Sequence, residues 1–217
     1  FKFFQPIREL SAQYGSLQSA MAASERIFKM LDEPIAISDP LAPHSVRQAK
    51  GQVEFEHCWF EYNPGEPVLK DISFMISPGE RVAFVGATGS GKSTVMSLLS
   101  RFYDVQKGSI RVDGDDVRNW AQSNLRRNIG IVLQDVFLFA GSVLDNITLG
   151  NPQIQRSDVD RVIQELGIQS VIDRLPKGYF TELGEKGRVL SVGERQLISF
   201  ARALAHDPSI LVLDEAT

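Results

Sequence analysis

One short segment constrains this chain more than any other. Residues 86–94 read Gly-Ala-Thr-Gly-Ser-Gly-Lys-Ser-Thr, and they follow an apolar run at 82–85 and open a helical pattern at 94–99. The glycines let the backbone curl so that successive N–H groups point inward beside a helix N-terminus, where phosphate oxygens bind well. This order of strand, glycine-rich loop and helix is typical of a phosphate-binding loop in an α/β domain.

We expect this loop to bind ATP, with Mg²⁺ as its companion ion. The alternative, a Gly/Ser-rich turn before a helix, does not account for Lys-Ser at the place where the chemistry needs it. Lys92 brings a full positive charge, and the Ser93 hydroxyl would bind Mg²⁺ between the β- and γ-phosphates. The residues expected to contact the nucleotide here are Gly86, Thr88, Gly89, Ser90, Gly91, Lys92, Ser93 and Thr94.

Composition excludes several classes of protein. The chain has 217 residues, of which 43% are hydrophobic and 23% charged, which is ordinary for a globular protein. Its net charge is -4 and its basic residues are scattered, so we expect no nucleic-acid partner. The single cysteine, Cys58, has no metal-ligand spacing around it, and no run of apolar residues is long enough to form a membrane-spanning helix.

The first part of the chain predicts a helical extension and a linker. Apolar residues recur at steps of three and four across residues 7–31, with only Ser24 breaking the seam, so we expect one amphipathic helix. A helix lying on the domain's own surface would show the same pattern. Prolines at 34, 40 and 43 indicate an extended linker, and the predicted organisation is therefore a helical extension at 1–33, a linker at 34–50 and one domain at 51–217.

The remaining segments predict a mixed α/β domain. Strand-like residues at 53–56 and 59–62, a turn at 63–65 and a further strand at 68–76 favour antiparallel pairing. Other strands are expected at 109–112 and 129–133, and helices near 157–166 and 192–205. The all-apolar run at 210–213 predicts a strand buried on both faces of a parallel sheet.

Two acidic residues end that last strand. Carboxylates at the C-terminal end of a parallel strand lie where α/β sheets bind ligands. Asp214 would hold the Mg²⁺ shell, and Glu215 would polarise the water that attacks the γ-phosphate. An Asp-Glu pair here could also cap a helix, but the phosphate-binding loop upstream favours the catalytic interpretation.

Residues 190–196, Leu-Ser-Val-Gly-Glu-Arg-Gln, resemble the signature motif of ATP-binding-cassette (ABC) proteins, usually Leu-Ser-Gly-Gly-Gln. The resemblance implies a P-loop NTPase (RecA-like) parallel-sheet core, an antiparallel β subdomain and a helical subdomain that carries the signature. It assigns Tyr62 to stacking on adenine, and Gln134 to contacting Mg²⁺ and sensing the γ-phosphate. Without the family, Tyr62 would be read as a strand aromatic in the core.

Further segments resemble exporter-type members of this family. These are residues 181–187, just before the signature, residues 139–147, and the helix at 7–31, which is similar to the cytoplasmic end of the last transmembrane helix. The resemblance implies that ATP hydrolysis drives export of a substrate, at the cytoplasmic face of a plasma or inner membrane. It also implies two partners, a transmembrane domain of the same or another chain and a second cassette, in a homodimer or heterodimer with ATP held between the two cassettes.

The signature departs from the usual pattern at two positions. Val192 replaces a glycine and Glu194 replaces a glutamine in the segment that would clamp the partner's ATP, whereas Ser191 and Gly193 fit the pattern. A carboxylate that faces phosphate is unfavourable unless Arg195 or Mg²⁺ offsets its charge. Ser191, the Gly193 backbone and the N-terminus of the following helix remain available, so we expect the signature to work, if weakly. We also expect Glu194→Gln to retain or raise ATPase activity.

The ends of the sequence suggest a piece of a longer protein, cut after the Walker B motif that Asp214 and Glu215 close. The resemblance implies a further strand between those of the phosphate loop and Asp214, and a switch histidine after it, a role that none of the three histidines fits. We therefore expect at most trace ATPase activity from the isolated polypeptide. Two other interpretations stay open: a soluble ABC ATPase of DNA repair or translation, and a catalytically degenerate regulatory module, against which Glu215 argues.

Overall fold

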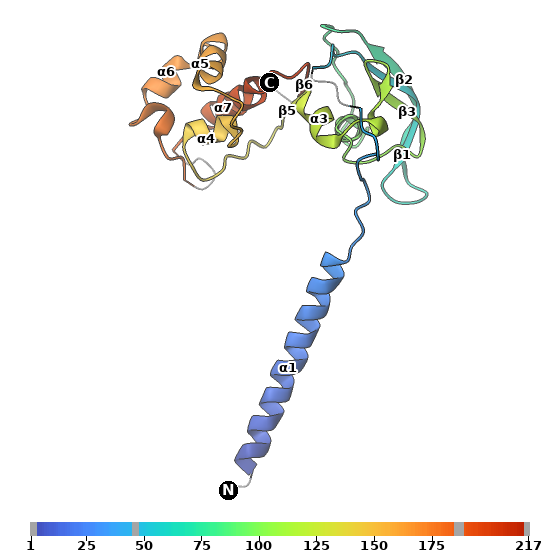
Figure 1. Cartoon of the computed structure of the whole chain (residues 1–217), viewed down its shortest axis with the longest axis vertical. Helices are drawn as coiled ribbons and strands as arrows, with labels where there is room; N and C mark the ends of the chain where they lie inside the picture. Colours follow the sequence, from blue (N-terminus) through green and yellow to red (C-terminus); the bar gives the residue numbers. More distant parts are fainter. Residues whose placement is uncertain (1–3, 45–47, 185–188, 215–217) are drawn as a thin grey trace. The chain divides into compact units, whose positions relative to one another are not determined.

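A computed structural model describes residues 4–44, 48–184 and 189–214. The chain forms two compact units, Phe1–Ser38 and Asp39–Thr217, and each has its own architecture (Figure 1). The predicted division at 1–33, 34–50 and 51–217 stays a prediction, although residues 49–52 are already tied to the second unit: the N–H of Ala49 donates to the Asn128 side chain at 2.7 Å, and the Asp113 carboxylate accepts from the N–H groups of the next three residues.

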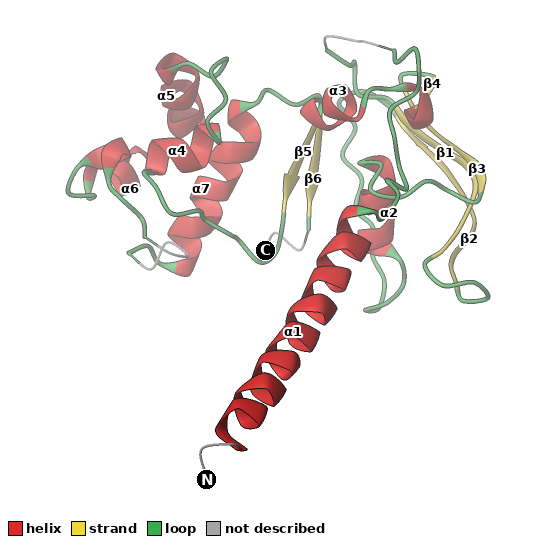
Figure 2. Ribbon diagram, turned by 60° about the horizontal axis from the view of Figure 1, so that its bottom comes forward, coloured by secondary structure: helices red, strands yellow, loops and turns green. Residues whose placement is uncertain are grey.

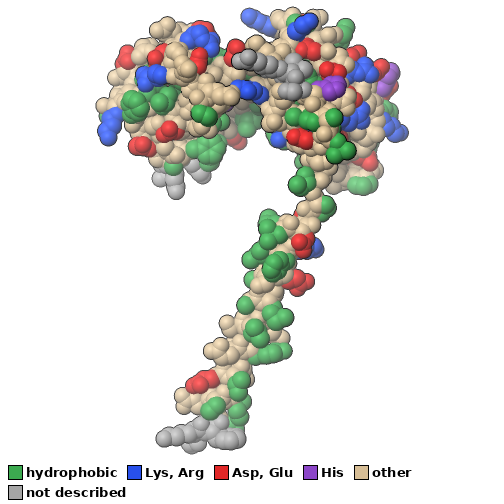
Figure 3. Space-filling model, in the orientation of Figure 1, with side chains coloured by type: hydrophobic (Ala, Val, Ile, Leu, Met, Phe, Trp, Pro, Cys, Tyr) green, Lys and Arg blue, Asp and Glu red, His purple; other side chains and the backbone are tan. Residues whose placement is uncertain are grey.

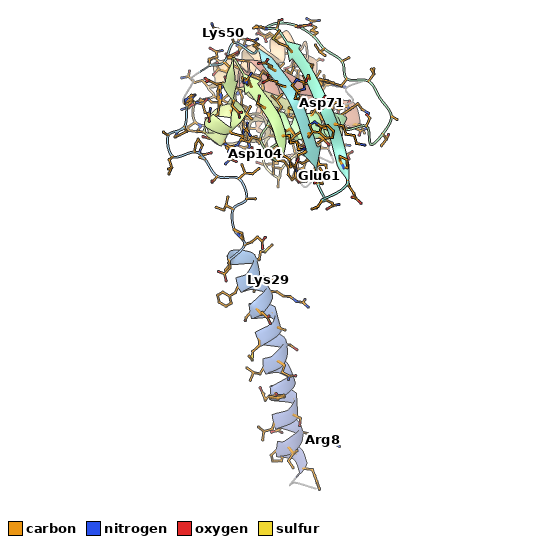
Figure 4. All side chains as sticks on the ribbon, turned by 90° about the vertical axis from the view of Figure 1, so that its right-hand side faces the viewer. Arg8, Lys29, Lys50, Glu61, Asp71 and Asp104 are labelled. Carbon is orange, nitrogen blue, oxygen red and sulfur yellow. The ribbon has the colours of Figure 1, made fainter. Side chains whose placement is uncertain are left out.

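The first unit contains one long helix, α1 (Phe4–Leu31), which confirms the predicted helix. None of its described side chains is buried, and its apolar seam is at least half exposed throughout: Ile7, Leu10, Tyr14, Leu17, Met21, Phe28 and Leu31. Figure 3 shows hydrophobic side chains along the helix, and Figure 4 shows the basic residues Arg8 and Lys29 near its two ends. Among the residues that the structure describes, no helix combines the length and the apolar character that crossing a membrane requires.

The second unit begins with a twisted antiparallel sheet in the order β2-β1-β3-β4 (Figure 2). Its strands are β1 (Val53–Glu61), β2 (Pro67–Ile76), β3 (Lys107–Val112) and β4 (Asp115–Asp116). Val53 pairs with Ile76 and Phe55 with Phe74, and the turn between the two strands closes through a hydrogen bond at residues 63–66. The predicted antiparallel pairing is confirmed.

The inner face of this sheet packs on the helix that follows the phosphate-binding loop, α2 (Lys92–Leu99). Short elements complete this part: η1 (Val117–Asn119) and α3 (Gln122–Arg127). Buried residues of the sheet, of α2, of α3 and of the segment after η1 form one hydrophobic core, which we call the first core. It includes Phe55, Cys58, Phe60, Leu98, Ile110, Val112, Trp120 and Leu125. Burial of apolar surface on both α2 and the sheet fixes the start of α2 against this part of the fold.

Two further strands, β5 (Ile129–Val132) and β6 (Ile210–Leu213), pair in parallel. The prediction that 210–213 is buried on both faces was wrong for one face, because Leu211 is 42% and Leu213 is 45% exposed. Ile210 and Val212 pack on the first core, whereas nothing among the described residues buries the opposite side chains.

The expected strand at 82–85 is absent from the described structure. These residues form no ladder, and Val82, Phe84 and Val85 are 46–92% exposed. A strand needs a neighbour to accept its backbone hydrogen bonds. The described strands β5 and β6 pair with each other and leave 82–85 without a ladder, and the expectation of a further strand between them stays a prediction.

The helical part of the second unit has a core of its own. It contains α4 (Val143–Thr148), α5 (Arg156–Glu165), α6 (Gln169–Asp173), η2 (Gly178–Phe180) and α7 (Val192–Ala205), which gather in one group in Figures 1 and 2. Helices α5 and α7 confirm the predicted helices within a residue. Reciprocal capping boxes open α4, α5 and α7, which explains why these helices start where they do.

Candidate functional site

The phosphate-binding loop owes its shape to its glycines. Gly89 and Gly91 have φ values of +84° and +92°, a region that other residues rarely adopt. A Cβ on Gly91 would also lie 2.7 Å from the Leu69 side chain of β2, because the loop passes close to the sheet before α2 begins. A hydrogen bond of 3.1 Å from the N–H of Ser90 to the carbonyl of Ala87 closes the curve.

Lys92 lies across the mouth of this loop. Its ammonium group donates to the carbonyl oxygens of Gly86 at 2.7 Å and Ala87 at 3.0 Å. Carbonyl oxygens are weaker partners for a cation than phosphate oxygens are, so the ammonium group can move to an anion that enters the loop. The N-terminus of α2 and the Lys92 charge therefore act on the same space.

Tyr62 and Thr94 bring the end of β1 to this helix. The Tyr62 hydroxyl donates to the Thr94 hydroxyl at 3.2 Å. The Tyr62 ring also meets the rings of Phe60 and Tyr103 edge-on, with centroids 4.8 Å and 5.1 Å away. Tyr62 is 47% exposed, so it is not the buried core aromatic that the strand pattern alone would suggest.

Gln134 and Asp214 follow the C-terminal ends of two paired strands. The N–H of Asp214 donates to the carbonyl of Val132 at 2.9 Å, which continues the β5–β6 ladder past Leu213. Both side chains therefore leave the same edge of the parallel pair, as expected for a ligand-binding edge. No hydrogen bond or ion pair of the described residues joins Asp214 to the loop at 86–91 or to Lys92. Glu215, the expected catalytic base, lies outside the described residues.

Ser93, Gln134 and Asp214 are the residues predicted to hold Mg²⁺. They supply a hydroxyl, an amide and a carboxylate, all oxygen donors of the kind that Mg²⁺ prefers. Few protein ligands suffice, because Mg²⁺ usually keeps waters and phosphate oxygens in its shell. The donor chemistry fits, and the described residues contain no denser group of His, Cys, Asp and Glu that would compete for a metal.

The expected signature forms the N-terminus of α7. Ser191 is the N-cap: its hydroxyl oxygen accepts from the N–H of Glu194 at 3.2 Å, and its own N–H donates to the Glu194 carboxylate at 2.8 Å. Val192 is 64% exposed, and a Cβ on Gly193 would meet nothing within 4 Å, so the backbone here is open to an approaching group.

Glu194 is offset by a different arginine from the one that the sequence suggested. The guanidinium of Arg195 donates to the carbonyl of Leu190 at 2.9 Å. Arg174, which directly follows α6, donates to the Glu194 carboxylate at 2.8 Å. Hydrogen bonds from Ser191 first, and the Arg174 charge in addition, hold the pKa of Glu194 below its usual range. No signal in the sequence could single out Arg174, because it lies 20 residues before Glu194 and at the end of a different helix.

The two segments similar to exporter sequences lie next to each other. The N–H of Val143 donates to the carbonyl of Thr181 at 3.1 Å, and the N–H of Leu183 donates to the carbonyl of Gly141 at 2.9 Å. These bonds hold 141–143 against 181–183, whereas Glu185 lies outside the described residues.

Arg202 of α7 fastens the chain that leaves β5 to the helical part. Its guanidinium donates to the carbonyl oxygens of Asn146 at 2.8 Å and Phe137 at 3.0 Å, and to the Asn146 side chain at 3.1 Å. Burial lowers the pKa of this guanidinium. Gln134 therefore stands at the start of a segment, 134–146, whose other end is bound to the helix that carries the signature.

Comparison with known proteins matches this chain to one family. The family model described as "ABC transporter" matches residues 69–217. The chain is 44% identical over 216 residues to the "Probable multidrug resistance ABC transporter ATP-binding/permease protein YheH" of Bacillus subtilis, covering 100% of this chain and 32% of that protein. It is 41% identical over 216 residues to the "Fatty acid ABC transporter ATP-binding/permease protein" of Mycobacterium bovis, covering 100% of this chain and 34% of that protein.

A solved structure is similar over the whole chain. It is a bacterial Atm1-family ABC exporter with ATP bound, it superimposes with a TM-score of 0.83 at 39% sequence identity, and the match covers 100% of this chain and 38% of that one. This chain thus spans about a third of the length of the curated relatives named above.

Proposed function

This chain belongs to the ABC transporter family, and we propose that it binds and hydrolyses ATP to drive export of a substrate across a membrane. The observation that carries the proposal is the phosphate-binding loop, with Lys92 folded across its mouth and the Tyr62 ring beside its helix. The triphosphate would lie against the loop N–H groups and Lys92, and the Tyr62 ring would take the adenine.

Hydrolysis is a transfer of the γ-phosphoryl group to water. Positioning and charge stabilisation dominate such transfers, and Lys92 with the loop N–H groups supplies both. Glu215 would accept a proton from the attacking water, and the Gln134 amide would orient that water or the metal. Mg²⁺, when bound through Ser93, Gln134 and Asp214, would neutralise charge on the phosphates.

The ATP site would be completed by a second cassette arranged head to tail. The Ser191 hydroxyl accepts one hydrogen bond from its own helix, and a hydroxyl that accepts still has its proton to donate. With the open backbone at Gly193, it would contact the γ-phosphate held by the other cassette. ATP binding would then close the pair, and hydrolysis would release it.

The coupling to transport would run through the helical part. Segments 141–143 and 181–183 are paired, and Arg202 ties Phe137 and Asn146, on either side of the first segment, to α7, so a change near Gln134 would reach both segments. We propose that these segments contact a transmembrane domain, of the same or another polypeptide, at the cytoplasmic face of the membrane. Helix α1, with its exposed apolar seam, would be the cytoplasmic end of the last transmembrane helix of that domain.

ATPase assays on membrane vesicles from cells that express the full coding sequence test the proposal. Glu215→Gln should lower kcat roughly 100-fold or more while nucleotide binding is kept, because a positioned general base contributes about 10²–10⁴-fold. Lys92→Ala should weaken nucleotide binding itself, and Glu165→Gln, on the exposed face of α5, is the matched control. A regulatory module would show no difference between wild type and Glu215→Gln, and a soluble ATPase would not sediment with the vesicles.

A further inference from the structure

The Glu194 carboxylate has a different partner on each oxygen. Oε2 accepts from the N–H of Ser191 at 2.8 Å, which is the capping bond of α7, and Oε1 accepts from the Arg174 guanidinium at 2.8 Å. Arg174 is itself anchored, because its Nε donates to the carbonyl of Ser170 in α6 at 3.2 Å. The pair thus links two separate helices of the helical part at the place where the signature begins.

We propose that Arg174 is a positioning residue of the signature: by pairing with Glu194 it keeps the N-terminus of α7 able to receive the polyphosphate of the opposite cassette. This inference rests on the proposed function and goes beyond it, because it assigns a role to a residue outside the signature motif. It also accounts for a glutamate at a position where the family usually has a glutamine.

The reasoning starts from the charge at the helix N-terminus. A helix of the length of α7 carries a partial positive charge at its start, which attracts phosphate. A carboxylate in the first turn cancels that charge and repels an incoming anion. The guanidinium of Arg174 restores the balance while the capping bond to Ser191, on the other oxygen, stays in place.

Other cations of the helix do not serve the same purpose. Arg195 is next to Glu194 in sequence, but its guanidinium donates to the carbonyl of Leu190. Arg202 lies in the last turn of α7 and binds Asn146 and Phe137. Among the residues that the structure describes, Arg174 is the residue with which Glu194 forms an ion pair.

Solvent limits the size of the effect. The Glu194 side chain is 23% exposed and that of Arg174 is 68% exposed, so water and salt screen the pair in part. For a triphosphate, which carries several charges, the loss of one compensating charge should raise the KM for ATP by roughly three- to tenfold. The rise should shrink at high salt, where the Debye length falls to about 3–5 Å.

The test is a double-mutant cycle on the ATPase activity of the full protein in vesicles. R174A should raise the KM for ATP by roughly three- to tenfold at low salt with little change in kcat, and R174K, which keeps the charge, should restore most of the affinity. In the E194Q background the same R174A change should alter KM less than about twofold, because glutamine keeps the capping bond without the charge. R161A, which removes an ion pair with Glu165 on α5, is the matched control and should leave KM unchanged.

The outcomes separate the two proposals. An active wild type with an unchanged KM in R174A, or an equal rise in KM with and without E194Q, would overturn the role of Arg174 alone. A wild type without ATPase activity, indistinguishable from Lys92→Ala, would overturn the proposed function and this inference with it. If R174A fails to fold, R174Q keeps most of the side chain's length without its charge and carries the same expectation.

Discussion

The hydroxyl of Tyr62 lies 3.2 Å from the hydroxyl of Thr94, so the end of β1 touches the first turn of the helix behind the phosphate-binding loop. The two residues come from the antiparallel sheet and from the loop's helix, and the shared core of these elements holds them together. The contact places an exposed aromatic ring beside the helix whose N-terminus follows the glycine-rich loop. A nucleotide has two ends that would suit these two groups: a flat base for the aromatic ring and a charged phosphate chain for the loop.

The first prediction concerns the Tyr62 ring. Tyr62→Ala should weaken ATP binding roughly 5- to 150-fold, because stacking of a base on an aromatic side chain contributes about 1–3 kcal/mol. Tyr62→Phe keeps the ring and loses the hydrogen bond to Thr94, so it should bind within about threefold of wild type. Titration with a fluorescent ATP analogue measures both. Equal losses in the two variants would mean that the hydroxyl, and not the ring, is what matters.

The second prediction concerns Gly91, the residue just before α2. Gly91→Ala should lower the free energy of unfolding by about 2–4 kcal/mol and abolish nucleotide binding, because it adds a methyl group against Leu69 to an already unfavourable positive φ. Gly114 has a similar φ of +86° with open space around its Cβ position, so Gly114→Ala should lose only about 1–2 kcal/mol. Urea unfolding of both variants gives the comparison. If the two losses are equal, close packing against β2 plays no part.

Local patterns were enough to predict most of the fold. The helix α1, the antiparallel pairing of β1 with β2, the loop with α2, and helices α5 and α7 all follow from periodicity, turn residues and capping, which are short-range properties. The strand at 82–85 and the buried far face of β6 were wrong, because both depend on partners that a local pattern does not contain. An apolar run indicates that a segment prefers burial, but it does not identify the elements that will pack on that segment.

The candidate site likewise contains residues that local motifs predict and one residue that they do not. Lys92, Thr94, Gln134, Asp214 and Ser191 belong to short motifs, so their positions on the chain could be read directly, although their roles stay predictions. The partner of Glu194 could not be found, because Arg174 is 20 residues away in the sequence and meets it only in the folded chain. The sequence offered two candidates, Arg195 and Mg²⁺, and the Arg195 guanidinium faces the Leu190 carbonyl instead.

A third prediction concerns Arg202, a half-buried cation bonded to neutral oxygens. Arg202→Met should lower the free energy of unfolding by about 1–3 kcal/mol, because it removes the side-chain donor to the carbonyl oxygen of the buried Asn146 and, with it, the bond to the Phe137 carbonyl. Arg161→Met removes an exposed pair with Glu165 and should change stability by no more than about 0.5 kcal/mol. Thermal unfolding monitored by circular dichroism would show the difference. A loss no larger than that of the control would mean that the 134–146 segment is held by other contacts.

The last prediction concerns an exposed pair on the outer sheet, His57 of β1 and Asp71 of β2. Both residues have positive φ values, 48° and 55°, and the His57 ring Nδ1 lies 2.7 Å from the Asp71 carboxylate. The hydrogen bond to Asp71, and then its charge, raise the pKa of His57 above 6.5, and Glu56 adds to the effect. A group whose pKa is higher in the folded state stabilises that state fully below its unfolded pKa.

That stabilisation is lost as the pH rises through the raised pKa of His57, so the pair should protect this part of the sheet most at mildly acidic pH. NMR titration of the His57 ring should give a pKa above 6.5 in the wild type, and Asp71→Asn should bring it back toward that value because the charge and the strong acceptor are gone. Hydrogen exchange of the β1–β2 amides, measured below and above the transition, reports the accompanying change in stability. An Asp71→Asn variant with the same His57 pKa as wild type would show that the carboxylate does not hold the imidazolium in solution, and the pH dependence would then need another source.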